Sequence, residues 1–390
     1  MFLGICGPID TEPFRAWLTD PPNRLPKGLG GTPVTDLARA AIEAGWRVAI
    51  FSLDTEVREE VILQGPGLKI YLGPFRPRCR ARDLFSRERA YLSRAIRRVK
   101  PAIVHAHWTY EFALGAIESG VPTVVTAHDA PLRVLRLNPT PYRLIRTLMA
   151  AQVARRARCL TAVSPMVADH FRRCFRYTAP ICVIPNGIPE EWFRKDPAAG
   201  CPQGISYASV LNGWGVLKNG KTILEAFRLV RASLSECELF LFGAGHGPGE
   251  EAEGWARQRG LGENVRFIGA VDRPTLLRRL KEQITILVHP SLEESFSMAI
   301  AEAMALGLPV IAGKNSGAVS DTLDAGRCGI LTDVRSPEAL GSEMLRLARS
   351  PGLRAHLGRA AADSAGKKFH MKAILDAYAD VYRAARAGAD

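Results

Sequence analysis

Two glutamates, Glu294 and Glu302, stand eight residues apart in the segment HPSLEESFSMAIAEAMALGLPVIAG at 289–313. Ionised carboxylates accept strong hydrogen bonds, and one carboxylate can bind two neighbouring hydroxyls at once. The residues after Glu294 predict a helix that starts near Ser295 and places Glu302 two turns further on. The first free N–H groups of such a helix suit a hydroxyl or a phosphate. The segment therefore predicts a site for a ligand that carries both groups.

A second motif, GVLKNGKT at 215–222, fits the P-loop pattern G-x-x-x-x-G-K-[ST]. A P-loop follows its strand immediately, but here the apolar run stops at Leu211 and NGW intervenes. An NTPase also needs a strand that ends in Asp or Glu to hold Mg²⁺, and the later strand-like runs have no acid at their tips. An NTPase, with Lys221 as its phosphate-binding lysine, therefore remains only an alternative.

Histidines form a third candidate constellation. His105 and His107 lie two residues apart on a predicted strand and point to the same side of it. With His128 and Asp129 they could form the metal site of a hydrolase, but no coherent set of metal-ligand spacings follows. A metal-dependent hydrolase is the second alternative, a packed structural role is favoured for His105, and no metal is expected.

The net charge of +13 is unevenly distributed. Residues 1–190 hold 27 Lys and Arg against 16 Asp and Glu, whereas residues 191–390 hold 25 against 23. The run 76–100 has ten cations and two anions, and 133–158 has seven arginines and no acid. These faces could be merely solvated, or they could contact an anionic membrane surface or a phosphorylated acceptor. Nucleic acid is not expected, because few aromatic residues interleave with the cations.

The composition is that of a globular protein, with 47% apolar and 23% charged residues. No stretch approaches the roughly 20 apolar residues of a membrane span. The N-terminus indicates a first strand rather than a signal peptide, and the eight cysteines show no C-x-x-C pair. We expect reduced thiols and a cytoplasmic protein. A peripheral position at the inner face of the membrane stays open.

Strand-like runs alternate with helical patterns along nearly the whole chain, which indicates α/β domains with parallel sheets covered on both faces. A chain of 390 residues is long enough for two such domains. A segment rich in Pro and Gly, 186–204, is the best candidate linker, so we expect domains at 1–190 and 191–366. Strands are expected at the N-terminus and at 47–53, 101–107, 122–128, 159–164, 179–185, 204–211, 237–245, 264–271, 284–291 and 308–313. Helices are expected at 33–45, 86–99, 142–157, 221–234, 273–282, 296–306 and around 367–386.

The segment 289–313 resembles the signature of glycosyltransferase family 4, whose members are retaining enzymes that use nucleotide-sugar donors. The two carboxylates, the loop-to-helix stretch between them and the strand GLPVIA fall in register. Other segments resemble the family in the same order, among them KGLGGTPVTDLARAAIEAGWRVAIFS, PTVVTAHD, AVSPMVADHF, VIPNGI, KNGKTILEAF and LFLFGAGHGPG. The resemblance implies the GT-B fold, in which two Rossmann-like parallel-sheet domains face an interdomain crevice. It also implies that a C-terminal helix at about 367–390 packs back on the first domain and that the second domain binds the donor.

The resemblance assigns roles to individual residues. Glu294 would bind the donor sugar, Glu302 the ribose and Lys218 the diphosphate, while His128 would reach the sugar. Glu294, Lys218 and His128 are thus the catalytic candidates.

Further candidates line the donor site. Gly30 and Gly31 would let the backbone approach the phosphates, which a Cβ would obstruct. The sequence departs from the family where Asn212 replaces a usual arginine and where serines replace the usual glycines of the signature loop. The remaining donor-binding candidates are Asn212, Ser295, Phe296 and Ser297, and the candidates for the crevice wall are His107 and Asn186.

The implied reaction needs neither a cofactor nor a metal, since no D-x-D motif is present. Lys218, backbone amides and helix N-termini would stabilise the departing nucleoside diphosphate. The donor would be of UDP-, GDP- or ADP-type. The acceptor hydroxyl would be lipid-linked or phosphorylated, as in the biosynthesis of cell-surface polysaccharide or glycoconjugates. A non-catalytic GT-B scaffold is the third alternative.

Overall fold

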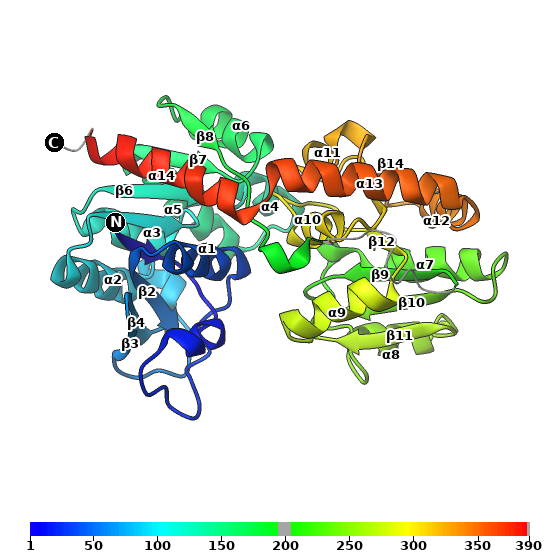
Figure 1. Ribbon diagram of the computed structural model, residues 1–390, viewed down its shortest axis with the longest axis horizontal. Helices are drawn as coiled ribbons and strands as arrows, with labels where there is room; N and C mark the ends of the chain where they lie inside the picture. The colour runs from blue at the N-terminus through cyan, green and yellow to red at the C-terminus, as the bar shows by residue number, and fades with distance from the viewer. Residues whose placement is uncertain (194–203, 388–390) are drawn as a thin grey trace. The chain divides into compact units, whose positions relative to one another are not determined.

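The computed structural model describes residues 1–193 and 204–387, which form two compact α/β units (Figure 1). The N-terminal unit comprises Met1–Gly187 together with the chain from Met371 onward. The C-terminal unit comprises Ile188–His370. Part of the predicted linker, 194–203, lies outside the described residues. Its first part forms the short helix η3 (Glu190–Trp192) within the C-terminal unit.

The N-terminal unit is built on an eight-stranded sheet in the order β3-β4-β2-β1-β5-β6-β7-β8. All neighbouring strands are parallel except β3 and β4, which form an antiparallel hairpin. The prediction of purely parallel strands is therefore wrong at this edge. Only two residues join β3 to β4, too few for a parallel crossover. The strands are β1 (Phe2–Cys6), β2 (Arg47–Asp54), β3 (Val61–Gly65), β4 (Leu68–Pro74), β5 (Ile103–His107), β6 (Thr123–Ala127), β7 (Cys159–Ala162) and β8 (Ile181–Val183).

Helices cover both faces of this sheet. Leu3 and Ile5 of β1 pack in one core cluster with residues of α1 and α14, whereas the Sγ of Cys6 contacts the backbone oxygen of Phe112 in α3. This alternation explains why the strand is apolar throughout. The helices are η1 (Glu12–Trp17), α1 (Thr32–Glu43), η2 (Arg80–Asp83), α2 (Ser86–Val99), α3 (Glu111–Glu118), α4 (Pro131–Leu137), α5 (Pro141–Arg156), α6 (Pro165–Cys174) and α14 (Met371–Ala387).

The last helix, α14, belongs to the core of the N-terminal unit. Tyr378 and Tyr382 are buried, and the Tyr382 hydroxyl lies 2.7 Å from Nδ1 of His105 on β5. Nε2 of the same imidazole lies 2.6 Å from the hydroxyl of Thr126 on β6. His105 is therefore packed and fully engaged inside the fold.

The C-terminal unit is built on a six-stranded, wholly parallel sheet in the order β11-β10-β9-β12-β13-β14. Its core joins Tyr207 of β9 to Phe227 of α7 and Met344 of α12, and the Tyr207 hydroxyl donates to the Met344 carbonyl at 3.0 Å. The strands are β9 (Ser206–Val210), β10 (Glu238–Phe242), β11 (Val265–Gly269), β12 (Ile286–His289), β13 (Val310–Gly313) and β14 (Ile330–Thr332). Besides η3, the helices are η4 (Val216–Lys218), α7 (Gly220–Arg231), α8 (Glu251–Arg257), α9 (Arg273–Gln283), α10 (Met298–Ala305), α11 (Val319–Thr322), η5 (Asp324–Gly326), α12 (Pro337–Arg349) and α13 (Pro351–Lys368).

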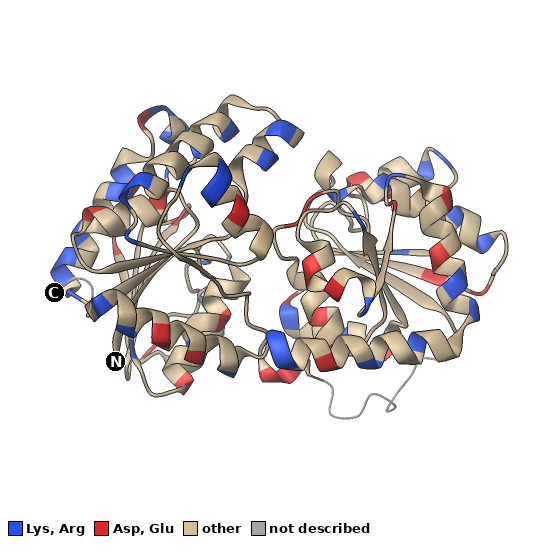
Figure 2. Ribbon diagram, turned by 90° about the horizontal axis from the view of Figure 1, so that it is seen from above, with Lys and Arg blue, Asp and Glu red and all other residues tan. Residues whose placement is uncertain are grey.

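Charged residues are unequally spread over the chain, and Figure 2 shows Lys and Arg on many helices of the unit that holds both termini. Many cations of the run 76–100 are paired, for example Arg76 with Glu88 at 2.6 Å and Arg98 with Glu60 at 2.7 Å. Within residues 1–193 and 204–387, no helix is long and apolar enough to cross a membrane. Every cysteine described there is a free thiol.

Candidate active site

A short turn at the carboxyl end of β9 positions Lys218. The turn η4 ends at Lys218, and Asn219 follows in the left-handed region with φ of 55°. The Asn219 amide donates to the carbonyls of Pro290, at 3.1 Å, and Val334, at 2.7 Å. These bonds tie the lysine turn to the loops that follow β12 and β14.

Lys218 meets Glu294 in the loop that follows β12. Its Nζ donates to Oε1 of Glu294 at 2.7 Å, and Nε2 of His289 lies 3.1 Å from the same oxygen. Burial raises the pKa of the Glu294 carboxyl. The hydrogen bond from His289 and the charge of Lys218 outweigh this effect and hold the pKa well below its usual range. Glu294 is therefore ionised at neutral pH and acts only as an acceptor.

His289 is a site residue that the sequence reasoning missed. It is the last residue of β12, is 2% exposed and also lies 3.3 Å from the Ser297 hydroxyl through Nε2. Because a carboxylate can only accept, Nε2 must carry the proton that is donated to Glu294. The only signal in the sequence was a histidine at the end of a strand, as the first residue of the signature segment.

The signature loop differs from the prediction at its helix. The helix α10 begins at Met298 with Ser297 as its N-cap, so it starts after Ser295 rather than near it. Ser295 instead lies in the loop before the helix, partly exposed. Phe296 is 5% exposed and packs edge-on against Phe369, which makes it a core residue of this unit.

Glu302 lies on α10 and is held by an arginine. Its Oε1 is 2.8 Å from Nη2 of Arg273, and only 7% of the Glu302 side chain is exposed. The Arg273 guanidinium in turn lies over the ring of Trp192, 5.1 Å from its centroid. A diol bound by Glu302 would therefore share the carboxylate with Arg273, which the sequence reasoning also missed.

The residues that match the end of the P-loop pattern, Gly220, Lys221 and Thr222, have structural roles that need no bound nucleotide. Lys221 lies in α7 with its Nζ 5.7 Å from the ring centroid of Trp255. A Cβ at Gly220 would come within 2.4 Å of the Trp214 ring, and Thr222 donates to the Asn219 side chain at 2.7 Å. These three residues thus serve packing and the turn. Asn212 is exposed in the loop that follows β9.

In the N-terminal unit the two candidate glycines have different surroundings. Gly31 has φ of 105° at the start of α1, and a Cβ there would lie 2.2 Å from the Pro8 carbonyl oxygen. The chain's own backbone therefore requires this glycine, in addition to the reason given from the sequence. Gly30 has φ of 75°, and no heavy atom lies within 4 Å of its Cβ position. The space beside Gly30 is open to a ligand.

The structure brings two of the candidate histidines together. Nδ1 of His107 and Nε2 of His128 are 3.0 Å apart, and Trp108 stacks on the His128 ring at 4.3 Å between centroids. Burial lowers the pKa of His128 to about 3 and the pKa of His107 well below its usual value. Both rings are therefore neutral at pH 7. Asn186 lies three residues beyond β8 and is partly exposed.

Some of the candidates thus form one group in each unit, whereas Glu302 pairs with Arg273 instead. Lys218, Glu294, Ser297 and the added His289 lie together in the C-terminal unit, and His107 and His128 lie together in the N-terminal unit. Among the described residues, no group of three or more His, Cys, Asp or Glu is placed to hold a metal ion.

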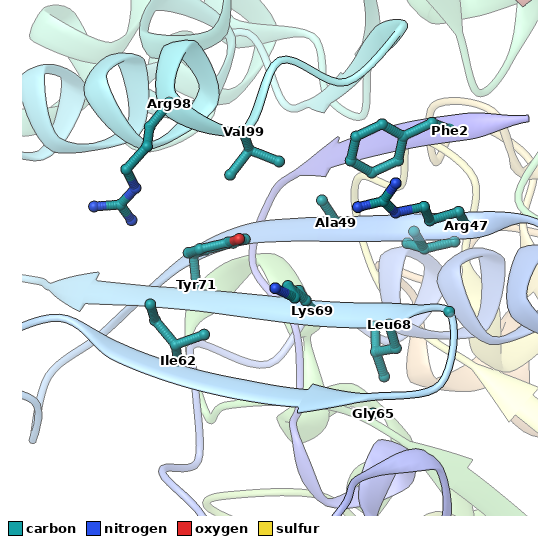
Figure 3. Close-up of a pocket in the computed structure, with 12 residues that line it drawn as sticks. Phe2, Arg47, Ala49, Ile62, Gly65, Leu68, Lys69, Tyr71, Arg98 and Val99 are labelled. Carbon is teal, nitrogen blue, oxygen red and sulfur yellow. The ribbon is translucent and has the colours of Figure 1, made fainter.

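A hollow of about 400 Å³ in the N-terminal unit is separate from these groups (Figure 3). Figure 3 shows Phe2, Arg47 and Leu68 on its wall, and these residues begin β1, β2 and β4. In open parallel sheets, ligands bind at the opposite, carboxyl ends of the strands. The hollow is therefore not part of the candidate active site.

Comparison with known families assigns the class of protein. The model described as Glycosyltransferase Family 4 matches residues 30–192, and the model described as Glycosyl transferases group 1 matches residues 210–364. Together the two models cover most of the chain. The protein belongs to glycosyltransferase family 4 and is a glycosyltransferase, as the signature segment predicted.

Individual relatives and solved structures agree with this assignment. The chain is 28% identical over 306 residues to D-inositol 3-phosphate glycosyltransferase of Segniliparus rotundus, covering 74% of this chain and 67% of the relative. It is 22% identical over 293 residues to N-acetyl-alpha-D-glucosaminyl L-malate synthase of Bacillus anthracis, covering 72% of this chain and 74% of the relative. Sucrose-phosphate synthase from Thermosynechococcus elongatus matches with a TM-score of 0.76 at 20% identity over 92% of this chain and 94% of that one.

The Anabaena protein HepE, solved in complex with UDP and glucose, matches with a TM-score of 0.69 at 16% identity over 98% and 100% of the two chains. At these identities the solved structures bear on the fold alone. The prediction of a GT-B fold made of two parallel-sheet α/β domains is confirmed.

Proposed function

We propose that the protein is a retaining glycosyltransferase that moves a sugar from a nucleotide-sugar donor to an acceptor hydroxyl. The observation that carries this proposal is the contact between Lys218 and Glu294, with Nζ 2.7 Å from Oε1. A cation and an ionised acceptor lie side by side in the segments that follow the carboxyl ends of two paired parallel strands, β9 and β12, where ligands of such sheets bind. A nucleotide sugar presents complementary groups, a diphosphate next to hydroxyls.

The two partners of this ion pair would bind different groups of the donor. An ammonium has three donors, so Lys218 can bind the diphosphate without leaving Glu294. The second oxygen of Glu294 is then available to a sugar hydroxyl, while His289 keeps the carboxylate in place. Glu302 would bind the ribose diol beside Arg273.

The transfer itself needs no metal ion or other cofactor in this proposal. The bond between the anomeric carbon and the diphosphate oxygen breaks with its electron pair on the diphosphate, whose charge Lys218 stabilises. The acceptor oxygen forms its bond on the same face, and its proton passes to the departing diphosphate. The configuration of the anomeric carbon is thereby retained.

The acceptor is proposed to be anionic, as a phosphorylated or lipid-linked hydroxyl compound. The names of both relatives contain anionic acceptors, an inositol 3-phosphate in one and malate in the other. Residues 1–190 of this chain also carry 27 cations against 16 anions. Such an acceptor fits the biosynthesis of cell-surface polysaccharide or glycoconjugates by a cytoplasmic protein at the inner face of the membrane.

Three substitutions test the proposal against the NTPase and the inactive scaffold. We expect Glu294→Gln and Lys218→Ala each to lower kcat for sugar transfer by about 100-fold or more, because each removes a charge from the reacting groups. Lys221→Ala is the matched control and should leave kcat within a few-fold. The donor is first chosen by thermal stabilisation with UDP-, GDP- and ADP-sugars. Nucleotide hydrolysis that depends on Lys221, or no transfer by the unaltered protein with any donor that binds, would contradict the proposal.

A further inference from the structure

Helices α4 and α5 carry a concentration of exposed apolar side chains. Eight large hydrophobic residues are exposed among the described residues, and four of them lie here. They are Leu137, Tyr142, Leu144 and Leu148, with exposed fractions of 39%, 42%, 50% and 53%. Leu144 and Leu148 are one turn apart on α5, so both point to the same side of that helix.

The same two helices are strongly cationic, because residues 133–158 contain seven arginines and no acid, and six of these arginines lie on α4 or α5. Arg136, Arg155 and Arg158 are exposed, and Arg155 lies two turns beyond Leu148 on the same side of α5. We call this set the α4–α5 surface. It comprises Arg136, Leu137, Leu144, Leu148 and Arg155.

Buried contacts of another arginine, Arg146, fix the orientation of α5 so that Leu144 and Leu148 stay exposed. Arg146 of α5 binds Glu111 of α3 at 2.5 Å and lies over the Tyr110 ring, 3.6 Å from its centroid. Thr147, Ala150 and Val153 form the buried side of the same helix. Because this side is fixed, the exposure of Leu144 and Leu148 is a property of the fold rather than of a frayed helix.

The other cationic run, 76–100, differs from the α4–α5 surface in its charge pairing and in its exposed apolar side chains. Its arginines are often neutralised by acids, as in the pairs of Arg76 with Asp83 and of Arg89 with Glu118. Helix α2 contributes no large exposed hydrophobic residue among those described. Of the two cationic runs, only the second therefore combines positive charge with exposed apolar surface.

We propose that the α4–α5 surface docks the protein on an anionic lipid bilayer. Leucines on a helix that lies flat can enter the boundary between headgroups and acyl chains, while neighbouring arginines contact lipid phosphates. An anionic bilayer complements both features, whereas an acidic protein would complement the charge alone.

The place of the surface also fits this occupant. Helix α4 begins at Pro131, three residues beyond His128, so the α4 end of the surface adjoins the carboxyl end of β6, while the far end of α5 leads to the amino end of β7. The argument that a lipid-linked acceptor is thereby brought to the site rests on the proposed function. The docking itself does not.

Vesicle binding tests the proposal directly. The full chain is sedimented with vesicles of phosphatidylcholine alone and of phosphatidylcholine with an equal part of phosphatidylglycerol, at low and at physiological salt. We expect binding to the anionic vesicles only, weaker at the higher salt. Replacing Leu144 and Leu148 together by Gln, which leaves the charge unchanged, should weaken binding at least tenfold, and so should replacing Arg136 and Arg155 together by Gln.

Matched variants control for general effects. The controls are Ile62→Gln, an exposed isoleucine on the edge strand β3, and the pair Arg87→Gln and Arg94→Gln, exposed arginines on α2. Both should bind as the unaltered protein does. Thermal unfolding shows that each variant is folded, and transfer to a water-soluble acceptor reports the proposed function separately.

Three outcomes would overturn the proposal. The unaltered protein could stay off anionic vesicles at low salt, or the leucine variant could bind as well as the unaltered protein. Equal binding to polyglutamate, with no effect of the leucines, would assign the surface to an acidic protein instead. None of these results would alter transfer to a water-soluble acceptor.

Discussion

Ser297 stabilises one end of a helix while its own backbone is strained. Its hydroxyl accepts a hydrogen bond from the backbone N–H of Ile300 as the N-cap of α10, at 3.4 Å. Its φ of 72° lies in the region that favours glycine, where a residue with a Cβ costs on the order of 1–3 kcal/mol. The serine is thus retained at a position where the backbone alone would select glycine.

Two substitutions at this position separate the cap from the strain. Ser297→Ala loses the cap but keeps the Cβ, so we expect the free energy of unfolding to fall by about 1 kcal/mol. Ser297→Gly also loses the cap but relieves the strain. Its free energy of unfolding should therefore be higher than that of the alanine variant by about 1–2 kcal/mol. Urea unfolding measures both. Ser336, an N-cap with φ of −99°, is the control. There the glycine and alanine variants should differ less in their free energy of unfolding. An equal difference at both positions would show that Ser297 is not strained.

Buried histidines make the N-terminal unit sensitive to acid. Burial lowers the pKa of His105 and of His128 to about 3, against about 6.5 in the unfolded chain. The unfolded state therefore binds more protons than the folded state between these values. The stability that this difference provides is complete above pH 6.5 and is lost as the pH falls from 6.5 towards 3.

Replacing one of these histidines should weaken the dependence on pH. Each contributes about 1.4 kcal/mol per pH unit within the window, so His128→Gln should reduce the slope of the unfolding free energy by about that amount. Urea unfolding at several pH values between 4 and 7 measures the slope. His356→Gln, at an exposed position of α13, is the control and should leave it unchanged. Equal slopes for His128→Gln and the unaltered protein would show that His128 is not kept neutral by the fold.

The sequence indicates residues of the site where a motif is continuous and misses those that meet only through the fold. Glu294, Glu302 and Lys218 are carried by recognisable segments. Arg273 lies on a different helix from Glu302, and no local pattern links them. His289 is the first residue of the signature segment, but its contact with Glu294 depends on how the loop turns after β12.

Among the elements, α9 and α10 act together, because each supplies one partner of an ion pair. Arg273 is the first residue of α9, and Asp272 caps that helix by accepting from the N–H of Thr275 at 2.7 Å. Glu302 lies in the second turn of α10. The relative placement of the two helices therefore sets the orientation of the proposed ribose ligand.

Removing the arginine should affect the binding of the donor more than the chemical step. We expect Arg273→Ala to raise KM for the donor about tenfold with kcat within a few-fold, because Glu302 loses the partner that orients it. Steady-state kinetics with the donor varied measure both constants. Arg278→Ala, which removes an exposed partner of Glu282 on the same helix, should change neither. A large fall in kcat with unchanged KM would place Arg273 at the reacting atoms instead.

The elements found from the sequence are those with simple patterns. Continuous apolar runs predicted β2, β5 and β6; β2 extends one residue beyond the prediction, and β5 and β6 are shorter than predicted by two residues each. The hairpin of β3 and β4 was missed because VILQGPGLKIYLGP mixes polar residues with Gly and Pro, which indicates turns rather than strands. Helix α3 was missed because its sides are nearly all apolar or small and show no amphipathic pattern.

At the scale of the whole molecule, the chain leaves the N-terminal unit at Gly187 and returns to it with α14. Tyr382 of this helix is fully buried against His105. The core of the N-terminal unit is therefore assembled from the two ends of the sequence.

The hydroxyl of Tyr382 allows the contribution of α14 to this core to be measured. Tyr382→Phe leaves Nδ1 of the buried His105 without its partner, so we expect the free energy of unfolding to fall by about 1–3 kcal/mol. Calorimetric or urea unfolding measures the loss. Tyr142→Phe, at a residue that is 42% exposed, should change stability by less than about 0.5 kcal/mol. Equal effects of the two changes would argue that α14 contributes little to this core.

The return of α14 has a consequence for limited proteolysis. A single cut between the two units, near residue 188, would produce a fragment that carries the whole second unit and still holds its final helix in the core of the first. The two pieces should elute together from a sizing column and come apart only in denaturant. A second cut near residue 370 would be needed to release the second unit from its neighbour.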